Sequence, residues 1–129
     1  MPTFSGIDHI ALTVTDLHVS LEFYERVLGV EADGAMSDGP FSRSVLPLPD
    51  GTHLGLTQHD SGSGEPFNPR TPGLDHVGFA CPLRSELARW SEHLDSMGVE
   101  HSGIQDAEYG SALSFKDPDG NALEFFASL

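Results

Sequence analysis

The stretch at residues 73–80, GLDHVGFA, decides the fold because a closely matching stretch, GIDHIALT, occurs earlier at residues 6–13. Both copies run glycine, apolar residue, aspartate, histidine, apolar residue, small residue, apolar residue, small residue. His9 and His76 are 67 residues apart (76 − 9), about half of the 129-residue chain. A match at such a long period indicates two copies of one structural unit. The sequence therefore predicts two repeats, each opening on a strand that carries a histidine.

The segments that follow these two strands also match. Each strand is followed by an amphipathic pattern typical of a helix, expected over residues 16–28 and 84–97, and each pattern ends at a glycine. A turn signal, PDG at residues 49–51 and DPDG at residues 117–120, comes before the last strand of each half. Eight strands are expected, at residues 7–14, 30–35, 41–48, 53–58, 74–81, 99–104, 111–116 and 122–127.

The unit is therefore βαβββ, and the predicted fold class is α+β with two such modules in tandem. The first module is expected over residues 5–60, a polar linker over 61–72, and the second module over 73–129. In the first strand, alternation places His9 and Ala11 on one face and Leu12 on the other.

Composition and charge limit the possible partners. The chain has 20 acidic and six basic residues and a formal charge of −14, which disfavours nucleic acids and anionic membranes as partners. A small neutral, hydroxylated or aromatic ligand fits better. Cys81 is the one cysteine, so neither a disulfide framework nor a thiolate metal cluster is expected. The N-terminal residues lack a basic segment followed by an apolar core, so the expected location is the cytoplasm.

Four segments carry a resemblance to a known family: residues 7–10 (IDHI), 20–29 (SLEFYERVLG), 74–77 (LDHV) and 117–125 (DPDGNALEF). They resemble the vicinal-oxygen-chelate superfamily, which includes glyoxalase I, extradiol dioxygenases, fosfomycin-resistance proteins and bleomycin-resistance proteins. The resemblance covers essentially the whole chain as one domain. It implies that the two modules form a cupped mixed β-sheet around a metal or ligand cavity. It also implies a homodimer, with module pairing either swapped between chains or within one chain.

The resemblance further implies metal ligands on the first and last strands of each module. Transferred position by position, these are His9, His76 and Glu124, while the fourth position falls on Gly55, which has no side chain to ligate. Two imidazoles and one carboxylate suit a divalent ion such as Fe, Mn, Zn, Ni or Co and leave coordination positions open. The missing fourth ligand departs from the glyoxalase I pattern.

Three residues are candidates for catalysis. Glu124 is one, because a carboxylate between apolar residues of a strand is costly unless a cation meets it. His53 is expected to point into the same cavity as Gly55, as a substitute ligand, a supporting partner or a proton shuttle. Tyr109 is a candidate acid or hydrogen-bond donor to substrate. Structural roles are expected for Asp8 and Asp75, and His18, His93 and His101 are expected to be solvated.

Two functions of different classes follow. The first is a divalent-metal-dependent enzyme, glyoxalase-like or extradiol-dioxygenase-like, acting as a lyase, isomerase or dioxygenase on a small oxygenated substrate chelated by the metal. The alternative is an antibiotic-sequestering binding protein of the bleomycin-resistance type, without catalysis. The acidic surface would attract a cationic drug in that case.

Overall fold

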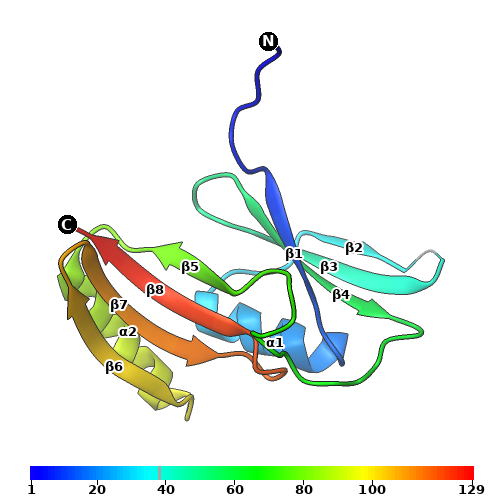
Figure 1. The fold of residues 1–129 in the computed structure, drawn as a ribbon. Helices are drawn as coiled ribbons and strands as arrows, with labels where there is room; N and C mark the ends of the chain where they lie inside the picture. Colours follow the sequence, from blue (N-terminus) through cyan, green and yellow to red (C-terminus); the bar gives the residue numbers. More distant parts are fainter. Residues whose placement is uncertain (38) are drawn as a thin grey trace. The chain divides into compact units, whose positions relative to one another are not determined.

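The computed structural model describes residues 1–37 and 39–129, and the chain divides into two compact units, Met1–Glu65 and Pro66–Leu129. Each unit has one helix and four strands in the order βαβββ (Figure 1). The first contains β1 (His9–Thr13), α1 (Leu17–Leu28), β2 (Gly34–Met36), β3 (Phe41–Pro47) and β4 (His53–His59). The second contains β5 (His76–Ala80), α2 (Arg84–Ser96), β6 (His101–Ala107), β7 (Gly110–Lys116) and β8 (Ala122–Ser128). The predicted α+β fold of tandem modules is confirmed.

The two sheets have the same topology. Their strand orders are β1-β4-β3-β2 and β5-β8-β7-β6, and in each sheet the first strand of the module lies parallel to the last. The remaining pairs are antiparallel. The register repeats as well. In each sheet the first residue of the module's first strand pairs with the first residue of its last strand: His9 with His53, and His76 with Ala122. Position 55 in the first sheet therefore corresponds to position 124 in the second.

Helix α1 begins and ends where the sequence predicts. The carboxylate of Asp16 accepts a hydrogen bond from the Val19 N–H at 3.2 Å, which satisfies one free donor of the first turn. Gly29 follows the helix with φ 69°, and its N–H bonds to the Glu25 carbonyl. Glycine adopts this left-handed conformation without a steric penalty, which ends the helix.

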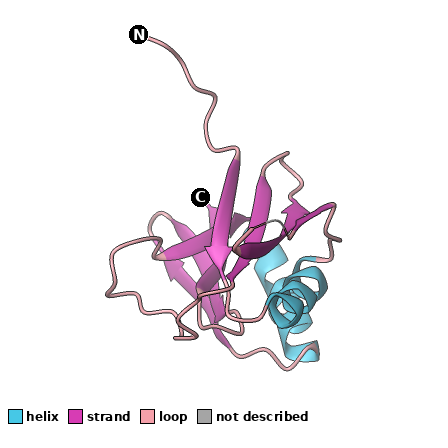
Figure 2. Cartoon of the chain, turned by 90° about the vertical axis from the view of Figure 1, so that its right-hand side faces the viewer, coloured by secondary structure: helices cyan, strands magenta, loops and turns pink. Residues whose placement is uncertain are grey.

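In each unit the helix packs on one face of the sheet, and the core lies between them. In the second unit Leu87 and Leu94 of α2 are fully buried with Leu113, Leu123 and Phe125 of β7 and β8. The predicted alternation therefore holds, because alternate strand residues point to this core and the others point away from the helix. Strands make up most of the ordered structure, and the segment before β1 runs away from its sheet as a loop (Figure 2). None of the helices in the described ranges is long and apolar enough to span a membrane.

The prediction for β2 was partly wrong. A strand was expected at residues 30–35, but β2 covers only Gly34–Met36. The N–H of Ala32 is held at 2.9 Å by the carboxylate of Glu25 in α1. This tertiary bond ties Ala32 to the helix, whereas the N–H of the next residue, Asp33, already bonds to the Val45 carbonyl of β3 at 3.0 Å.

A surface ion pair joins the start of α2 to β6. The guanidinium of Arg84 donates from Nε and Nη2 to the two carboxylate oxygens of Asp106, at 2.7 and 2.9 Å. Arg84 lowers the pKa of Asp106 to about 2, with Ser111 contributing a further hydrogen bond.

Because the pKa of Asp106 is lowered in the folded state, its ionised form stabilises the fold at every pH above its ordinary value near 3.8, and this contribution disappears as the pH falls through about 2. Asp106→Asn is therefore expected to reduce the melting temperature slightly at pH 7. The difference from wild type should shrink progressively between pH 4 and pH 2. Thermal melts at these pH values check this, and a difference that is constant with pH would contradict it.

Candidate functional site

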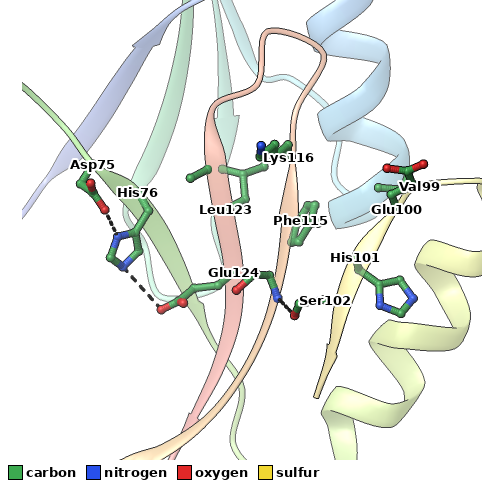
Figure 3. Close-up of a pocket in the computed structure, with 12 residues that line it drawn as sticks. Asp75, His76, Val99, Glu100, His101, Ser102, Phe115, Lys116, Leu123 and Glu124 are labelled. Carbon is green, nitrogen blue, oxygen red and sulfur yellow. Dashed lines mark hydrogen bonds and ion pairs between the residues drawn. The ribbon is translucent and has the colours of Figure 1, made fainter. Parts of the chain in front are cut away.

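The candidate site lies on the face of the second sheet turned away from α2, the open face of this sheet. His76 on β5 and Glu124 on β8 both belong to this face, because Leu123 and Phe125, the neighbours of Glu124, point into the helix-covered core. The His76 Nε2 atom lies 3.6 Å from Glu124 Oε1, and the two side chains point toward one another (Figure 3). The side chain of Glu124 is 23% exposed. The structure therefore brings two of the three predicted metal ligands together.

Asp75 orients the imidazole of His76. Its Oδ2 lies 2.8 Å from His76 Nδ1, on the side of the ring opposite Glu124 (Figure 3). When Nδ1–H donates to this carboxylate, the neutral ring keeps its lone pair on Nε2, which is the atom turned toward Glu124. The hydrogen bond that His76 donates to Asp75 raises the pKa of His76; partial burial opposes this shift, and the negative charges of Glu124 and Asp75 add to it.

Gly78 gives the carboxylate of Glu124 its position. Gly78 pairs with Glu124 across β5 and β8, and a Cβ at residue 78 would lie 3.2 Å from Glu124 Oε1 and 3.5 Å from its Cγ. The side chain of Glu124 therefore lies directly over the backbone of Gly78. Any larger residue at this position must displace the carboxylate.

A cavity of about 680 Å³ opens beside this pair. Its lining includes His76 and Glu124 from the open face, Lys116 at the end of β7, and Ser102 and Ser114 from β6 and β7. The hydroxyl of Ser102 accepts a hydrogen bond from the Ser114 N–H at 3.0 Å (Figure 3). A small polar molecule would meet both charged and hydroxyl groups in this cavity.

The first sheet repeats part of this arrangement. Asp8 Oδ1 lies 2.8 Å from His9 Nδ1, as Asp75 lies from His76. His53 pairs with His9, and its Nε2 lies 3.9 Å from a carboxylate oxygen of Asp33. Gly55 stands at the position of Glu124, so this sheet supplies imidazoles without the carboxylate.

The structural roles expected for Asp8 and Asp75 were incomplete, because both are hydrogen-bonded to the histidines of the candidate site. Asp8 and Asp75 precede β1 and β5, so strand alternation does not determine where their side chains point. The signal in the sequence was the Asp-His dipeptide itself, which both repeats contain.

Tyr109 lies in the turn between β6 and β7, away from this pair. Its residue exposure is 75%, and its ring stacks on Phe126 with centroids 6.1 Å apart. Gly110 pairs with Ser128, whereas Glu124 pairs with Ser114, so Tyr109 and Glu124 belong to different ends of β8. The structure therefore does not bring Tyr109 to His76 and Glu124.

The expectation that His101 is solvated was wrong. Its side chain is only 14% exposed, and its Nε2 lies 2.7 Å from Asp95 of α2. Its Nδ1 accepts a hydrogen bond from the Gly103 N–H at 3.0 Å. His101 pairs with the core residue Phe115, so its ring belongs to the face covered by α2 (Figure 3).

The donor set suits a divalent metal. An imidazole whose distal nitrogen is held by a carboxylate is the usual arrangement of metal-binding histidines, and a neighbouring carboxylate completes a pair of hard and borderline donors. Within residues 1–37 and 39–129, no three His, Cys, Asp or Glu side chains are clustered closely enough to hold an ion. A third ligand must therefore join the pair for a site to form.

The match to a family model decides the identity of the fold. Residues 6–125 match the model of the Glyoxalase/Bleomycin resistance protein/Dioxygenase superfamily. The chain belongs to this superfamily. The resemblance seen in the repeated IDHI and LDHV segments is thereby confirmed.

Several members of this superfamily are similar over nearly the whole chain. A domain of the superfamily from Frankia sp. EAN1pec has a TM-score of 0.92 and 31% identity, covering 98% of this chain and 100% of that one. A probable trivalent organoarsenical cleaving enzyme of Bacillus subtilis is 30% identical over 92% of this chain and 77% of its own length. A putative ring-cleaving dioxygenase of the same organism, MhqA, is 27% identical over 92% of this chain. The chain spans only 39% of the length of that dioxygenase.

Proposed function

We propose that this chain is a divalent-metal-dependent enzyme whose metal is bound by His76 and Glu124, with His9 of a first module as the third ligand. The observation that carries the proposal is the line Asp75–His76–Glu124, with 2.8 Å between Asp75 and Nδ1 and 3.6 Å between Nε2 and Glu124. The matching Asp8–His9 pair, also at 2.8 Å, supports His9 as the third ligand. The first module that supplies His9 belongs to the same chain or to the second subunit of a homodimer.

Each residue has a defined part in this proposal. Asp75 and Asp8 fix the tautomer of the two histidines, so that Nε2 is free to ligate. The carboxylate of Glu124 supplies the negative charge that attracts a divalent cation to the site. A bound divalent ion would act as a Lewis acid toward two neighbouring oxygens of a substrate. His53, on the same face as His9, is the group proposed to accept or return a proton, whereas Tyr109 is given no part because of its place in the β6–β7 turn.

Ring cleavage of a small catechol-like substrate is the reaction to test first. A catechol-2,3-dioxygenase of Bacillus subtilis is 30% identical and a manganese-dependent 2,3-dihydroxybiphenyl 1,2-dioxygenase of Geobacillus genomosp. 3 is 26% identical to this chain. The chain spans 41% and 35% of these proteins, so the activity of the whole relatives is carried here as part of the proposal.

Metal content tests the proposal directly. We expect about one divalent ion per chain in protein expressed with Fe, Mn, Zn, Ni and Co supplied, and at least about a tenfold lower content in His76→Ala and Glu124→Ala. His18→Ala, an exposed histidine of α1, is the matched control and should keep the ion. Elemental analysis of the purified proteins measures this.

Metal bound equally by wild type and Glu124→Ala would show that the ion sits elsewhere. The absence of stoichiometric metal in all four proteins would overturn the enzyme proposal. Sequestration of a small cationic ligand without catalysis, as in bleomycin-resistance proteins, would then be the leading function, since the charge of −14 favours such a ligand.

A further inference from the structure

We propose that the first sheet carries an anion subsite built on Arg43, which binds the carboxylate of a small organic acid. The subsite rests on the proposed function in one respect: the molecule that carries the carboxylate is the substrate. Its geometry lies entirely within the first unit, on the face of the first sheet turned away from α1, the open face of this sheet.

The guanidinium of Arg43 is fixed by two contacts. Its Nε donates a 2.7 Å hydrogen bond to the hydroxyl of Thr57, its direct partner across β3 and β4. Its guanidinium carbon lies 4.7 Å from the centre of the Phe41 ring, in a cation–π contact. Thr57 is only 3% exposed, so the anchor of the guanidinium is itself held in place. A guanidinium fixed in this way loses little conformational freedom when it binds a ligand.

The charge of Arg43 has no carboxylate partner among the described residues. Arg84 pairs with Asp106 and Arg89 pairs with Glu86, whereas no ion pair within residues 1–37 and 39–129 includes Arg43. The bond to Thr57 uses one of the five N–H donors of the guanidinium. A half-buried arginine without a carboxylate partner in the described part of the chain is unexpected in a sequence with 20 acidic residues, and we infer that its remaining donors bind a carboxylate from outside.

The residues next to Arg43 on the open face have little or no side chain. Gly55 and Ala11 are cross-strand partners, and a Cβ at residue 55 would lie 3.8 Å from Arg43 Cδ and 3.3 Å from the Ala11 methyl. In the second sheet the equivalent pair is Glu124 over Gly78. The first sheet therefore has a cation beside a glycine at the position where the second sheet has a carboxylate. A carboxylate carried by the ligand would complement this cation.

Benzoate and its neutral analogue benzamide test the subsite on the metal-free protein. We expect benzoate to shift the Arg43 Nε–H resonance in NMR titrations and to bind at least about tenfold more tightly than benzamide. Arg43→Met should abolish this preference, and Arg43→Lys should weaken it because a lysine cannot make two parallel bonds to a carboxylate. Arg70→Met, which removes an exposed arginine of a loop, is the matched control and should bind benzoate as wild type does.

The metal content of the same variants separates this inference from the proposed function. Loss of benzoate binding in Arg43→Met with metal content unchanged supports the subsite. Benzoate binding in a wild-type protein that binds no metal also supports it, while overturning the proposed enzyme. Equal binding of benzoate and benzamide, or benzoate binding retained by Arg43→Met, overturns the subsite whatever the metal content.

Discussion

Replacing Phe125 with alanine is expected to lower the free energy of unfolding by about 3–5 kcal/mol, and the melting temperature by about 10–20 °C. Phe125 is 2% exposed and lies at the centre of an aromatic cluster. Its ring stacks on Trp90 of α2 at 4.0 Å and on Phe115 of β7 at 5.2 Å, and it lies 5.8 Å from Phe79 of β5. The substitution removes contacts to three secondary-structure elements at once and leaves a cavity between the helix and the sheet.

Phe126→Ala is the matched control for this prediction. Phe126 is the next residue of β8, points to the open face and stacks on the exposed Tyr109. Its loss should cost less than the loss of Phe125, about 1.5 kcal/mol, because Phe126 is only half-buried. Chemical unfolding of both variants measures the difference. Equal costs would mean that the helix-covered face is not the core of the second unit.

The repeat made most of the fold predictable. Two matching strand starts, two amphipathic helix patterns and two matching turn signals predict the order βαβββ, and the glycines at 29 and 98 follow the helix ends. Boundaries that depend on a tertiary bond were not predictable. β2 begins later than expected, after the residue at which Ala32 bonds to Glu25 of α1, and periodicity contains no information on such a bond.

The residues of the candidate site were predictable in part, whereas some of their contacts were not. The side chains of His76 and Glu124 come within 3.6 Å because β5 and β8 are neighbours, and the family resemblance already placed both residues on the first and last strands of the second module. The bond from Asp75 to His76 was missed because Asp75 precedes the strand and is free of its alternation. The buried position of His101 was missed because it depends on the pairing of His101 with the core residue Phe115, which the sequence does not reveal. Both errors concern directions that are set by the strand boundaries and by the register, which periodicity alone does not determine.

The small residue beneath the carboxylate provides the most specific test of the site. Gly78→Ala is expected to lower the affinity for a divalent ion by about 10–100-fold, although it changes no ligand. The new methyl group would lie 3.2 Å from Glu124 Oε1, a tight contact, so the carboxylate must shift by a few tenths of an ångström from its present place beside His76.

Gly34→Ala is the matched control, because residue 34 also lies in a strand and a Cβ there would make only an ordinary 3.8 Å contact with Val45. Competition with a fluorescent chelator measures the metal affinity of both variants, and thermal melts report whether each remains folded. A folded Gly78→Ala protein with wild-type affinity would show that the carboxylate of Glu124 need not lie over residue 78 to bind the ion.

Since Ala11 already occupies the equivalent position in the first sheet, opposite Gly55, the same argument explains why a carboxylate at residue 55 would be crowded there. The asymmetry between the two sheets thus involves two positions in each sheet, and restoring a fourth ligand would require room at residue 11 as well as a carboxylate at residue 55.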